Sequence, residues 1–470
     1  MGLVFLLVII GSYIFIIRFS RKNKNNSNRF NNPRVINSKS TLEKTDLNLL
    51  KLSTEQKQLF NRIEHTKSHL FVTGKAGTGK SVLLQYFKNN SKKKVIVCAP
   101  TGVSALNVGG QTIHSLFKIP PTFVESNSLS VYGKTALLLK NIDTLVIDEV
   151  SMVRADLMDA IDHIMKLARG NNEPFGGAQV VMFGDLYQLP PVVNSSELHK
   201  YFSHYHDGYF FFNANIWKHA LLNIFELNHI FRQKDENFKN ILNSIRVGNI
   251  SNELLETLNK RVENYPIDNN VITLTTTNKI AADINQVKLD SLEGKLFQYK
   301  AKISGDLSQS AFPTDDILSF KKGAQVIMLK NDKDKRWVNG SLGIIDSLSK
   351  DHIKVKINGF KYTVPLETWN KITYLYNIET EKIEEDIVSS FAQYPLRLAW
   401  AITIHKSQGQ TYDAVAIDLG NGSFAHGQTY VALSRCKSLD KLYLKRKVKA
   451  EDIIVDQDII NFMSKTTKLS

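Results

Sequence analysis

The sequence predicts an α/β protein with two lobes, each built on a parallel sheet, and a small antiparallel β-barrel inserted into the second lobe. From Leu49 onward, short apolar runs alternate with helical patterns, which is typical of parallel sheets covered by helices on both faces. Residues 300–392 instead alternate apolar and polar positions between Gly and Asn-Gly turns, which is typical of antiparallel strands. A chain of 470 residues is long enough for such domains.

The first lobe is expected over residues 46–230. Four apolar runs, each ending in glycine, threonine or an acid, are buried-strand candidates: "HLFVTG", "KKVIVCAPT", "DTLVIDEV" and "AQVVMFGD". The stretch "ADLMDAIDHIMKLA" between the last two carries its apolar residues at helical spacing. Strands that alternate with helices form a parallel sheet, and its functional loops lie at the carboxyl ends of the strands.

The second lobe is expected over residues 231–470. Its strand candidates are "NVITLTTTN" and, after the β insertion, "PLRLAWAITIHKSQG" and "DAVAIDLG". A helical pattern, "KIAADINQVKLDSL", follows the first of them.

The N-terminus differs from the rest of the chain. Residues 1–20 contain a run of fifteen uncharged, mostly apolar residues, "LVFLLVIIGSYIFII", and residues 21–45 form a basic Asn/Lys-rich stretch expected to be a flexible linker. Because the charges follow the apolar run, the pattern favours a short membrane anchor with the bulk of the chain on the cytosolic side. A targeting presequence or a misassigned start codon is the alternative, and the nucleus and the mitochondrion are the alternative locations.

Charge and cysteine content restrict the function classes. The formal net charge of +15 points to a polyanionic partner such as nucleic acid, although Lys- and Asn-rich composition alone produces the same excess. The chain has two cysteines, which fits a reducing compartment and excludes a four-cysteine iron–sulfur cluster.

A phosphate-binding loop lies between the first strand and a helix. The segment "GKAGTGKS" fits the P-loop pattern, in which backbone N–H groups and a helix N-terminus face phosphate oxygens. Lys80 is expected to reach the β and γ phosphates, and Ser81 to hold Mg²⁺. The alternative is a Gly-rich turn that only caps a helix. The predicted nucleotide-binding residues of this loop are Gly74, Lys75, Ala76, Gly77, Thr78, Gly79, Lys80 and Ser81.

Acids, an amide and two arginines complete the predicted catalytic set. Asp148 follows a buried strand and is expected to hold Mg²⁺, while Glu149 activates the attacking water. Gln188 lies in a proline-stiffened loop where it can sense the γ phosphate. Arg232 and Arg435 are expected to complete the site across a cleft. The alternatives are acids that solvate a strand end, a surface amide and surface arginines.

Eight strings in order resemble the petite-integration-frequency helicases, a superfamily 1 group similar to the RecD type. The match covers about residues 50–445, and the resemblance implies two RecA-like P-loop NTPase lobes, ATP and Mg²⁺ as cofactors, and ATP-dependent DNA unwinding. The strings are "LSTEQKQLF", "GKAGTGKS", "APTGVSALNVGGQTIHSLF", "LVIDEVSMV", "FGDLYQLPPV", "LNHIFRQ", "AITIHKSQGQTYDAV" and "YVALSRCKSLDKLYL".

The resemblance also implies roles for individual residues. Gln56 is similar to the adenine-reading glutamine of the family, and Gly409 would approach the γ phosphate through its N–H group. Five residues match positions that face the backbone of single-stranded DNA, which suits binding without base readout. These are Thr101, His114, Thr403, His405 and Ser407. For the two histidines the alternative is a core side chain with satisfied hydrogen bonds.

The expected function is an ATP-dependent DNA helicase that moves 5′→3′ along single-stranded DNA, a direction that follows from the resemblance alone. Single-stranded and forked DNA are its expected partners, and the motor is expected to be monomeric. Residues 117–135 are expected to form the wedge that splits the duplex. An RNA translocase, or a membrane-tethered ATP-dependent binding switch that unwinds nothing, is the alternative. A relaxase-type helicase is disfavoured because the segment before the motor leaves no room for a nuclease domain.

Overall fold

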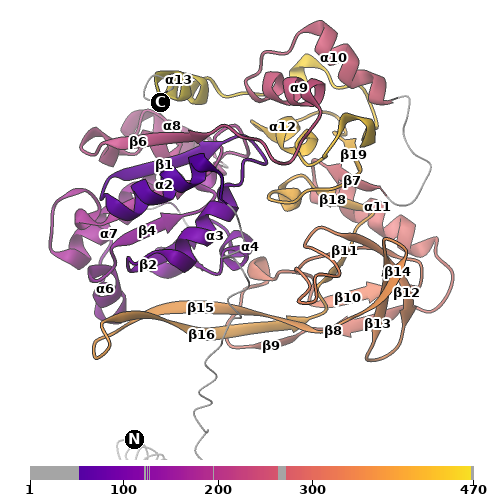
Figure 1. Ribbon diagram of the computed structural model, residues 1–470, viewed down its shortest axis with the longest axis horizontal. Coiled ribbons are helices and arrows are strands. Elements are labelled where there is room, and N and C mark those ends of the chain that lie inside the picture. The colour runs from indigo at the N-terminus through magenta and orange to yellow at the C-terminus, as the bar shows by residue number, and fades with distance from the viewer. Residues whose placement is uncertain are drawn as a thin grey trace, which may run out of the picture. The chain divides into compact units, whose positions relative to one another are not determined.

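The computed structural model describes residues 52–120, 123, 125, 128–193, 195–262 and 271–466, which belong to one compact unit. We refer to residues 52–227 as the N-terminal region, to residues 297–398 as the β insertion, and to residues 236–290 with 399–466 as the C-terminal region. Figure 1 shows these three parts in indigo to magenta, in orange, and in rose with yellow.

The N-terminal region is built on a six-stranded sheet of order β3-β2-β4-β5-β1-β6, in which all neighbouring strands are parallel. Strands β4 and β5 and almost all of β1 and β2 are buried, which explains their uninterrupted apolar runs. The four strands predicted for the first lobe are confirmed. The strands are β1 (His69–Gly74), β2 (Val95–Ala99), β3 (Gln111–Thr112), β4 (Thr144–Ile147), β5 (Gln179–Phe183) and β6 (Leu222–Leu227).

Helices connect these strands. The longest is α7, whose last turn is followed by Gly170 in the left-handed conformation that ends many helices. The helices are α2 (Thr54–His65), α3 (Lys80–Asn90), α4 (Gly102–Asn107), α5 (Ile113–Phe117), α6 (Gly133–Lys140), α7 (Ala155–Arg169) and α8 (Ser196–Tyr205).

A second, four-stranded parallel sheet of order β18-β7-β19-β20 forms the centre of the C-terminal region. The α/β class with parallel sheets is therefore confirmed. The strands are β7 (Ile272–Thr275), β18 (Ala401–Thr403), β19 (Val415–Asp418) and β20 (Leu442–Leu444). The helices are α9 (Glu236–Arg246), α10 (Asn252–Asn259), α11 (Asn278–Asp290), α12 (Gln428–Leu433) and α13 (Gln457–Thr466).

The strands of the β insertion pair antiparallel, in sheets of order β14-β13-β12-β11-β17, β10-β8 and β15-β16-β9. Strand β13 alternates buried and exposed residues, as an antiparallel strand with one solvated face does. The barrel form of this part stays a prediction. The strands are β8 (Phe297–Lys300), β9 (Lys302–Ser304), β10 (Ile317–Phe320), β11 (Gln325–Met328), β12 (Leu342–Leu348), β13 (Ile353–Ile357), β14 (Phe360–Val364), β15 (Glu367–Asn377), β16 (Lys382–Gln393) and β17 (Leu396–Leu398).

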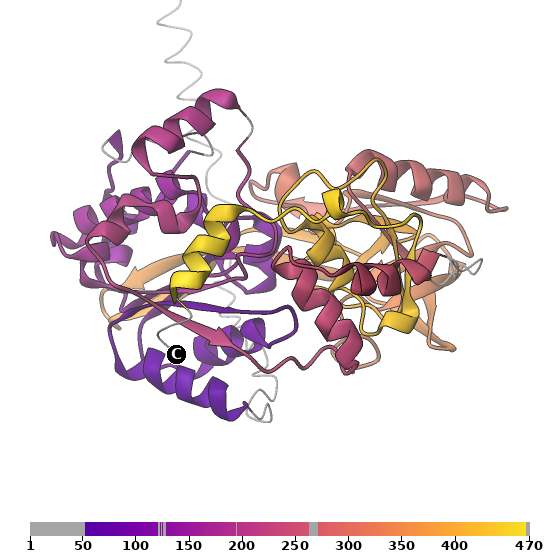
Figure 2. The same cartoon turned by 90° about the horizontal axis from the view of Figure 1, so that it is seen from above.

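Two contacts tie distant parts of the chain to the N-terminal region. The long β15–β16 hairpin reaches it, as Figure 1 shows, and Glu385 there forms an ion pair of 3.1 Å with Lys88 of α3. Helix α13, the last yellow helix in Figure 2, returns to the N-terminal region near the end of the chain. There Phe462 stacks on Phe212 with ring centroids 4.2 Å apart. The β insertion and helix α13 therefore both contact the N-terminal region.

Several predictions concern segments that the structure describes only in part. The expected anchor (1–20) and linker (21–45) lie outside the described residues. Among the helices that are described, none combines the length and apolar character needed to cross a bilayer. The expected wedge (117–135) is described only at its two ends and at a few positions between them, so it stays a prediction.

Candidate nucleotide site

The loop between β1 and α3 has the geometry of a phosphate cradle. Gly77 has a φ of 86°, and a Cβ atom there would lie 2.5 Å from the Cβ of Arg232, so only glycine fits. Helix α3 begins at Lys80, and its first N–H groups lack partners within the helix. The Nζ of Lys80 donates to the carbonyl oxygens of Gly74 and Lys75, at 2.6 and 3.2 Å. The ammonium group is thus held over the loop where phosphates would bind.

Two carboxylates follow β4 and face this loop. Burial, followed by the neighbouring Glu149 charge, raises the pKa of Asp148 to about 7. Burial also raises the pKa of Glu149, although the positive charge of Lys80 opposes that shift. Glu149 has a φ of 50°, a left-handed conformation that is costly for a residue with a side chain and that occurs at functional sites. The carboxylates of Asp148 and Glu149 therefore repel each other, and a bound cation would relieve that repulsion.

This donor set fits a divalent cation. Adjacent oxygen ligands with mutual repulsion are the environment that Mg²⁺ favours, and Ser81 is exposed in the first turn of α3. Asp148 and Ser81 are the residues that would hold the ion. When bound together with nucleotide, the ion would neutralise phosphate charge.

Gln188 lies in a buried network that the sequence did not predict. Its Nε2 donates to Asp185 Oδ2 at 3.3 Å, and Asp185 Oδ1 accepts from Arg246 Nη2 at 3.0 Å. Asp185 is also within electrostatic reach of Lys80, whose pKa it raises against the larger effect of burial. Gln188 and the P-loop lysine therefore share one carboxylate neighbour.

Arg232 reaches the P-loop from beyond β6, and Arg435, in the turn after α12, acts electrostatically on Arg232 and Glu149. Arg232 packs its Cβ against Gly77 and donates from Nη1 to the carbonyl of Ser434 at 3.1 Å. Arg435 is 1% exposed and donates to the carbonyls of Val431 and Gln410 and to the hydroxyl of Ser434, at 2.9, 3.3 and 2.8 Å. The positive charge of Arg435 opposes the burial-driven rise in the pKa of Glu149, so Arg435 acts electrostatically on that carboxyl group.

Burial, followed by repulsion from Arg435, lowers the pKa of Arg232 to about 9. Within the described parts of the chain, neither arginine has a carboxylate within ion-pair distance. Two cations that repel each other beside a P-loop favour an anion between them.

A tyrosine of the C-terminal region touches the P-loop directly. The hydroxyl oxygen of Tyr430, on α12, accepts a hydrogen bond of 2.9 Å from the N–H group of Ala76. Tyr430 is 3% exposed, and burial raises its pKa, so the phenol stays neutral. One amide of the loop thus already has a partner from the other region.

Gln56 and Gln408 also lie at the site. Gln56 caps α2 together with Ser53, and its Nε2 donates to the P-loop carbonyls of Thr78 and Gly79 at 3.5 and 3.4 Å. Gln408 Nε2 donates to Glu149 Oε2 at 3.2 Å. This bond brings the residue next to Gly409, which has a φ of 77°, into contact with Glu149.

The predicted DNA-facing residues differ in exposure. His405 is exposed, and Thr101 and His114 are half-buried. Thr403 and Ser407 are buried: the Thr403 hydroxyl accepts from the Lys406 N–H at 3.3 Å, and the Ser407 hydroxyl donates to the Ile404 carbonyl at 2.7 Å. Those two hydroxyls fasten a turn rather than face a surface. The DNA contacts of all five residues stay predictions.

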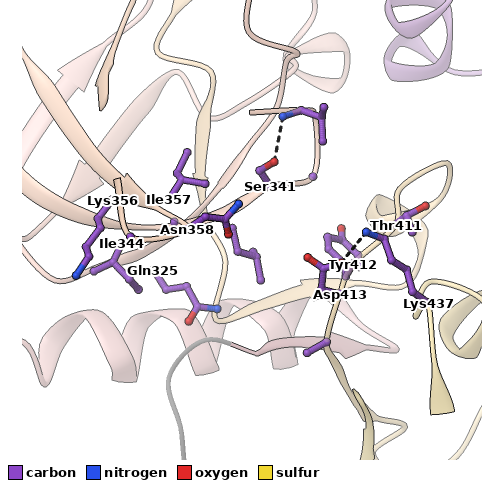
Figure 3. A pocket seen from close by; sticks show the side chains of 16 residues that line it. Gln325, Ser341, Ile344, Lys356, Ile357, Asn358, Thr411, Tyr412, Asp413 and Lys437 are labelled. Atoms are coloured by element: carbon purple, nitrogen blue, oxygen red, sulfur yellow. Dashed lines mark hydrogen bonds and ion pairs between the residues drawn. The ribbon is translucent and has the colours of Figure 1, made fainter. Parts of the chain in front are cut away.

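A separate cavity of about 410 Å³ lies between the β insertion and the C-terminal region (Figure 3). Gln325, Ser341 and Asn358 line it from the insertion, and Tyr412 and Lys437 from the other side. Lys437 pairs there with Asp413 at 2.6 Å. None of the predicted site residues lines this cavity, which is therefore distinct from the nucleotide site.

Three site residues were missed by sequence reasoning. Asp185 had a usable signal, because it lies two residues after the end of β5, near the same sheet edge as Asp148 after β4. Tyr430 and Arg246 had none, since Tyr430 reaches the P-loop and Arg246 reaches the loop after β5 only through the packing of α12 and α9 on the N-terminal region.

Comparison with known proteins identifies the family. The PIF1-like helicase model matches residues 51–256. The ATP-dependent DNA helicase PIF1 of Xenopus laevis is 33% identical over 84% of this chain and 61% of its own length, so the chain spans about three fifths of that relative. The Pif1 helicase of Bdellovibrio bacteriovorus is 30% identical over 88% of this chain and 92% of its own length. Unliganded Pif1 from Bacteroides sp is 38% identical, with a TM-score of 0.82 and coverage of 89% and 97% of the two chains. The predicted family is thus confirmed, and this chain belongs to the PIF1-like helicases.

Proposed function

We propose that this chain is an ATP-dependent DNA helicase that moves along single-stranded DNA. One observation carries the proposal: Arg232 and Tyr430, which lie outside the first sheet, contact its P-loop, and the charge of Arg435 acts on Glu149. A triphosphate bound there would contact both regions at once. Its hydrolysis would remove a charge that holds them together, which couples chemistry to relative movement.

Each side chain has a role that its contacts support. The Lys80 ammonium exchanges its two loop carbonyls for phosphate oxygens. Glu149, held by Gln408, accepts a proton from the attacking water. Gln188 orients that water, and Arg232 and Arg435 stabilise the charge that develops on the transferred phosphoryl group. With Mg²⁺ on Asp148 and Ser81, these groups form a complete hydrolytic set.

The comparisons support DNA as the track. The Bacteroides Pif1 chain, 38% identical to this one, has been solved in complex with ADP-AlF4, bound to ssDNA, and at forked dsDNA with two coordinating helicases. We extend single-stranded and forked DNA to this chain as partners. Thr101, His114 and the exposed His405 are the residues on which we would first test backbone contacts. The 5′→3′ direction, a monomeric motor and an N-terminal membrane tether belong to the same proposal.

The proposal is tested with one unwinding assay on duplexes that carry either a 5′ or a 3′ single-stranded tail. We expect ATP-dependent strand separation from the 5′-tailed substrate, and ATP hydrolysis stimulated by single-stranded DNA. Separation from the 3′ tail only would reverse the polarity. Hydrolysis that single-stranded RNA stimulates and DNA does not would favour an RNA translocase. The absence of any nucleic-acid stimulation would favour a binding switch.

A further inference from the structure

Helix α9 is fastened to the nucleotide site at both of its ends. Just before it, Gln233 is 2% exposed and donates from Nε2 to the carbonyls of Ser434 and Cys436, at 3.2 and 3.0 Å, which flank Arg435. At its last residue, Arg246 donates to Asp185 in the loop after β5. The helix therefore links the turn that carries Arg435 to the loop that carries Gln188.

The carboxylate of Asp185 fixes which way the Gln188 amide points. An ionised carboxylate only accepts hydrogen bonds, so the amide NH₂ group must turn toward it. Asp185 Oδ2 receives that bond at 3.3 Å. The Gln188 carbonyl oxygen is consequently left as an acceptor, which is the group needed to orient an attacking water. If residue 185 could donate as well as accept, both orientations of the amide would be allowed.

Arg246 is built to keep Asp185 ionised and in place. The two side chains are 6% and 0% exposed, and Arg246 Nη2 lies 3.0 Å from Asp185 Oδ1, so the bond is made without competing water. The guanidinium lies over the Tyr187 ring, with its Cζ 4.2 Å from the centroid, and approaches Glu226 of β6 at 3.4 Å. The ring and the second acid restrict the arginine to one geometry.

We propose that Asp185 and Arg246 are positioning residues for nucleotide hydrolysis, and that the Arg246–Asp185–Gln188 chain transmits the state of the γ-phosphate position to α9 and the Arg435 turn. The inference rests on the proposed ATPase function. It explains why residue 185 is an acid and why Arg246, which bonds Asp185, lies beside it. Loss of the pair would impair the chemical step more than nucleotide binding.

A double-mutant cycle on ATP turnover tests this proposal. Gln188→Ala is expected to lower kcat of the DNA-stimulated reaction by about 100-fold. Asp185→Asn is expected to lower it by about 10- to 100-fold. The double variant should be no slower than the slower single variant, because both changes remove the same oriented amide. Affinity for ADP should stay within about threefold of the parent, while affinity for ADP-AlF4 falls with kcat.

Two further variants separate positioning from folding. Arg246→Lys keeps the charge beside Asp185 and should retain more turnover than Arg246→Met. The matched control is Asp162→Asn on α7, a buried carboxylate that pairs with Lys166 at 2.7 Å and accepts from the Phe175 N–H. It should lower the thermal midpoint, leave kcat unchanged, and combine additively with Gln188→Ala.

The outcomes are distinguishable. Non-additive loss with intact ADP affinity supports the proposal. Suppose the parent hydrolyses ATP. If the losses of kcat in Asp185→Asn and Gln188→Ala then multiply in the double variant, or if the variants lose as much affinity for ADP as for ADP-AlF4, the inference alone is overturned. A parent without nucleotide hydrolysis overturns the proposed function and the inference with it.

Discussion

The two sides of the nucleotide site hold their charges differently. On the N-terminal side, burial has the largest effect on the pKa values of Lys80, Asp148 and Glu149; Lys80 and Glu149 also act on each other, and both act on Asp148. On the other side, Arg232 and Arg435 rest on carbonyl and hydroxyl oxygens and repel each other. The acids and the lysine on the first side lie within electrostatic reach of one another, whereas neither arginine has a carboxylate within ion-pair distance in the described parts of the chain. We propose that a phosphate anion completes the arginine side.

The largest expected effect comes from the N-terminal side. Lys80→Ala should lower ATP turnover by more than about 1,000-fold, since it removes the cation beside the transferred phosphoryl group. Single-stranded DNA binding should stay near the parental value. Lys93→Ala is the matched control, because Lys93 also donates to backbone carbonyls, those of Ile63 and Thr66. Parental turnover in Lys80→Ala would show that the loop is not the phosphate site.

The arginine side is tested next with Arg232→Met. Turnover is expected to fall by about 100-fold or more, because the charge that would stabilise the transition state is lost. Gln233→Leu breaks the neighbouring bonds to the Ser434 and Cys436 carbonyls without removing a charge, and should cost much less. The measurement is the steady-state ATPase rate of both variants and of the parent. Equal losses in the two variants would mean that Arg232 only joins the two regions.

A smaller effect is expected at the contact between the two sides. Tyr430→Phe leaves the Ala76 N–H without its acceptor and should lower the free energy of unfolding by about 1–3 kcal/mol. A phosphate oxygen could replace the lost acceptor, so a non-hydrolysable ATP analogue should raise the thermal midpoint more in the variant than in the parent. Equal shifts in both proteins would exclude Ala76 from nucleotide binding.

The smallest effect concerns His426, which joins the loop after β5 to the segment before α13. Its ring bonds the Leu186 carbonyl at 2.8 Å and accepts from the Asp456 N–H at 2.9 Å. Burial lowers the pKa of His426, so its stabilising contribution is present above the ordinary histidine pKa of 6.5 and is lost as pH falls through that value toward the lowered one. Thermal midpoints measured from pH 7.5 to 5.5 should therefore fall more steeply in the parent than in His426→Asn. If the thermal midpoints of the parent and of His426→Asn fell equally with pH, the proposed contribution of the neutral His426 ring would be contradicted.

The same contrast explains what the sequence could predict. The P-loop, Asp148 and Glu149 follow directly from strand–loop–helix order, because the carboxyl ends of β1 and β4, two strands of one parallel sheet, lie at the same edge. Arg232 and Arg435 were found through the constellation of motifs. Tyr430 and Arg246 were not, since their roles depend on how α12 and α9 pack across the junction.

The sequence pattern also could not predict which of the candidate DNA-facing side chains are buried. Thr403 and Ser407 lie in a string that resembles the family's DNA-facing motif, yet their hydroxyls are buried and fasten the turn around Lys406. A sequence match gives the position of a residue along the chain. It does not give the direction of its side chain.

The most direct test measures ATP turnover and ADP affinity of Arg435→Lys in the presence of single-stranded DNA. Lysine keeps the charge but cannot reproduce the three bonds that hold the guanidinium in place. If both regions share one triphosphate, kcat should fall by about 1,000-fold while ADP affinity remains within about threefold of the parent. Unchanged turnover in a folded variant would contradict a shared site.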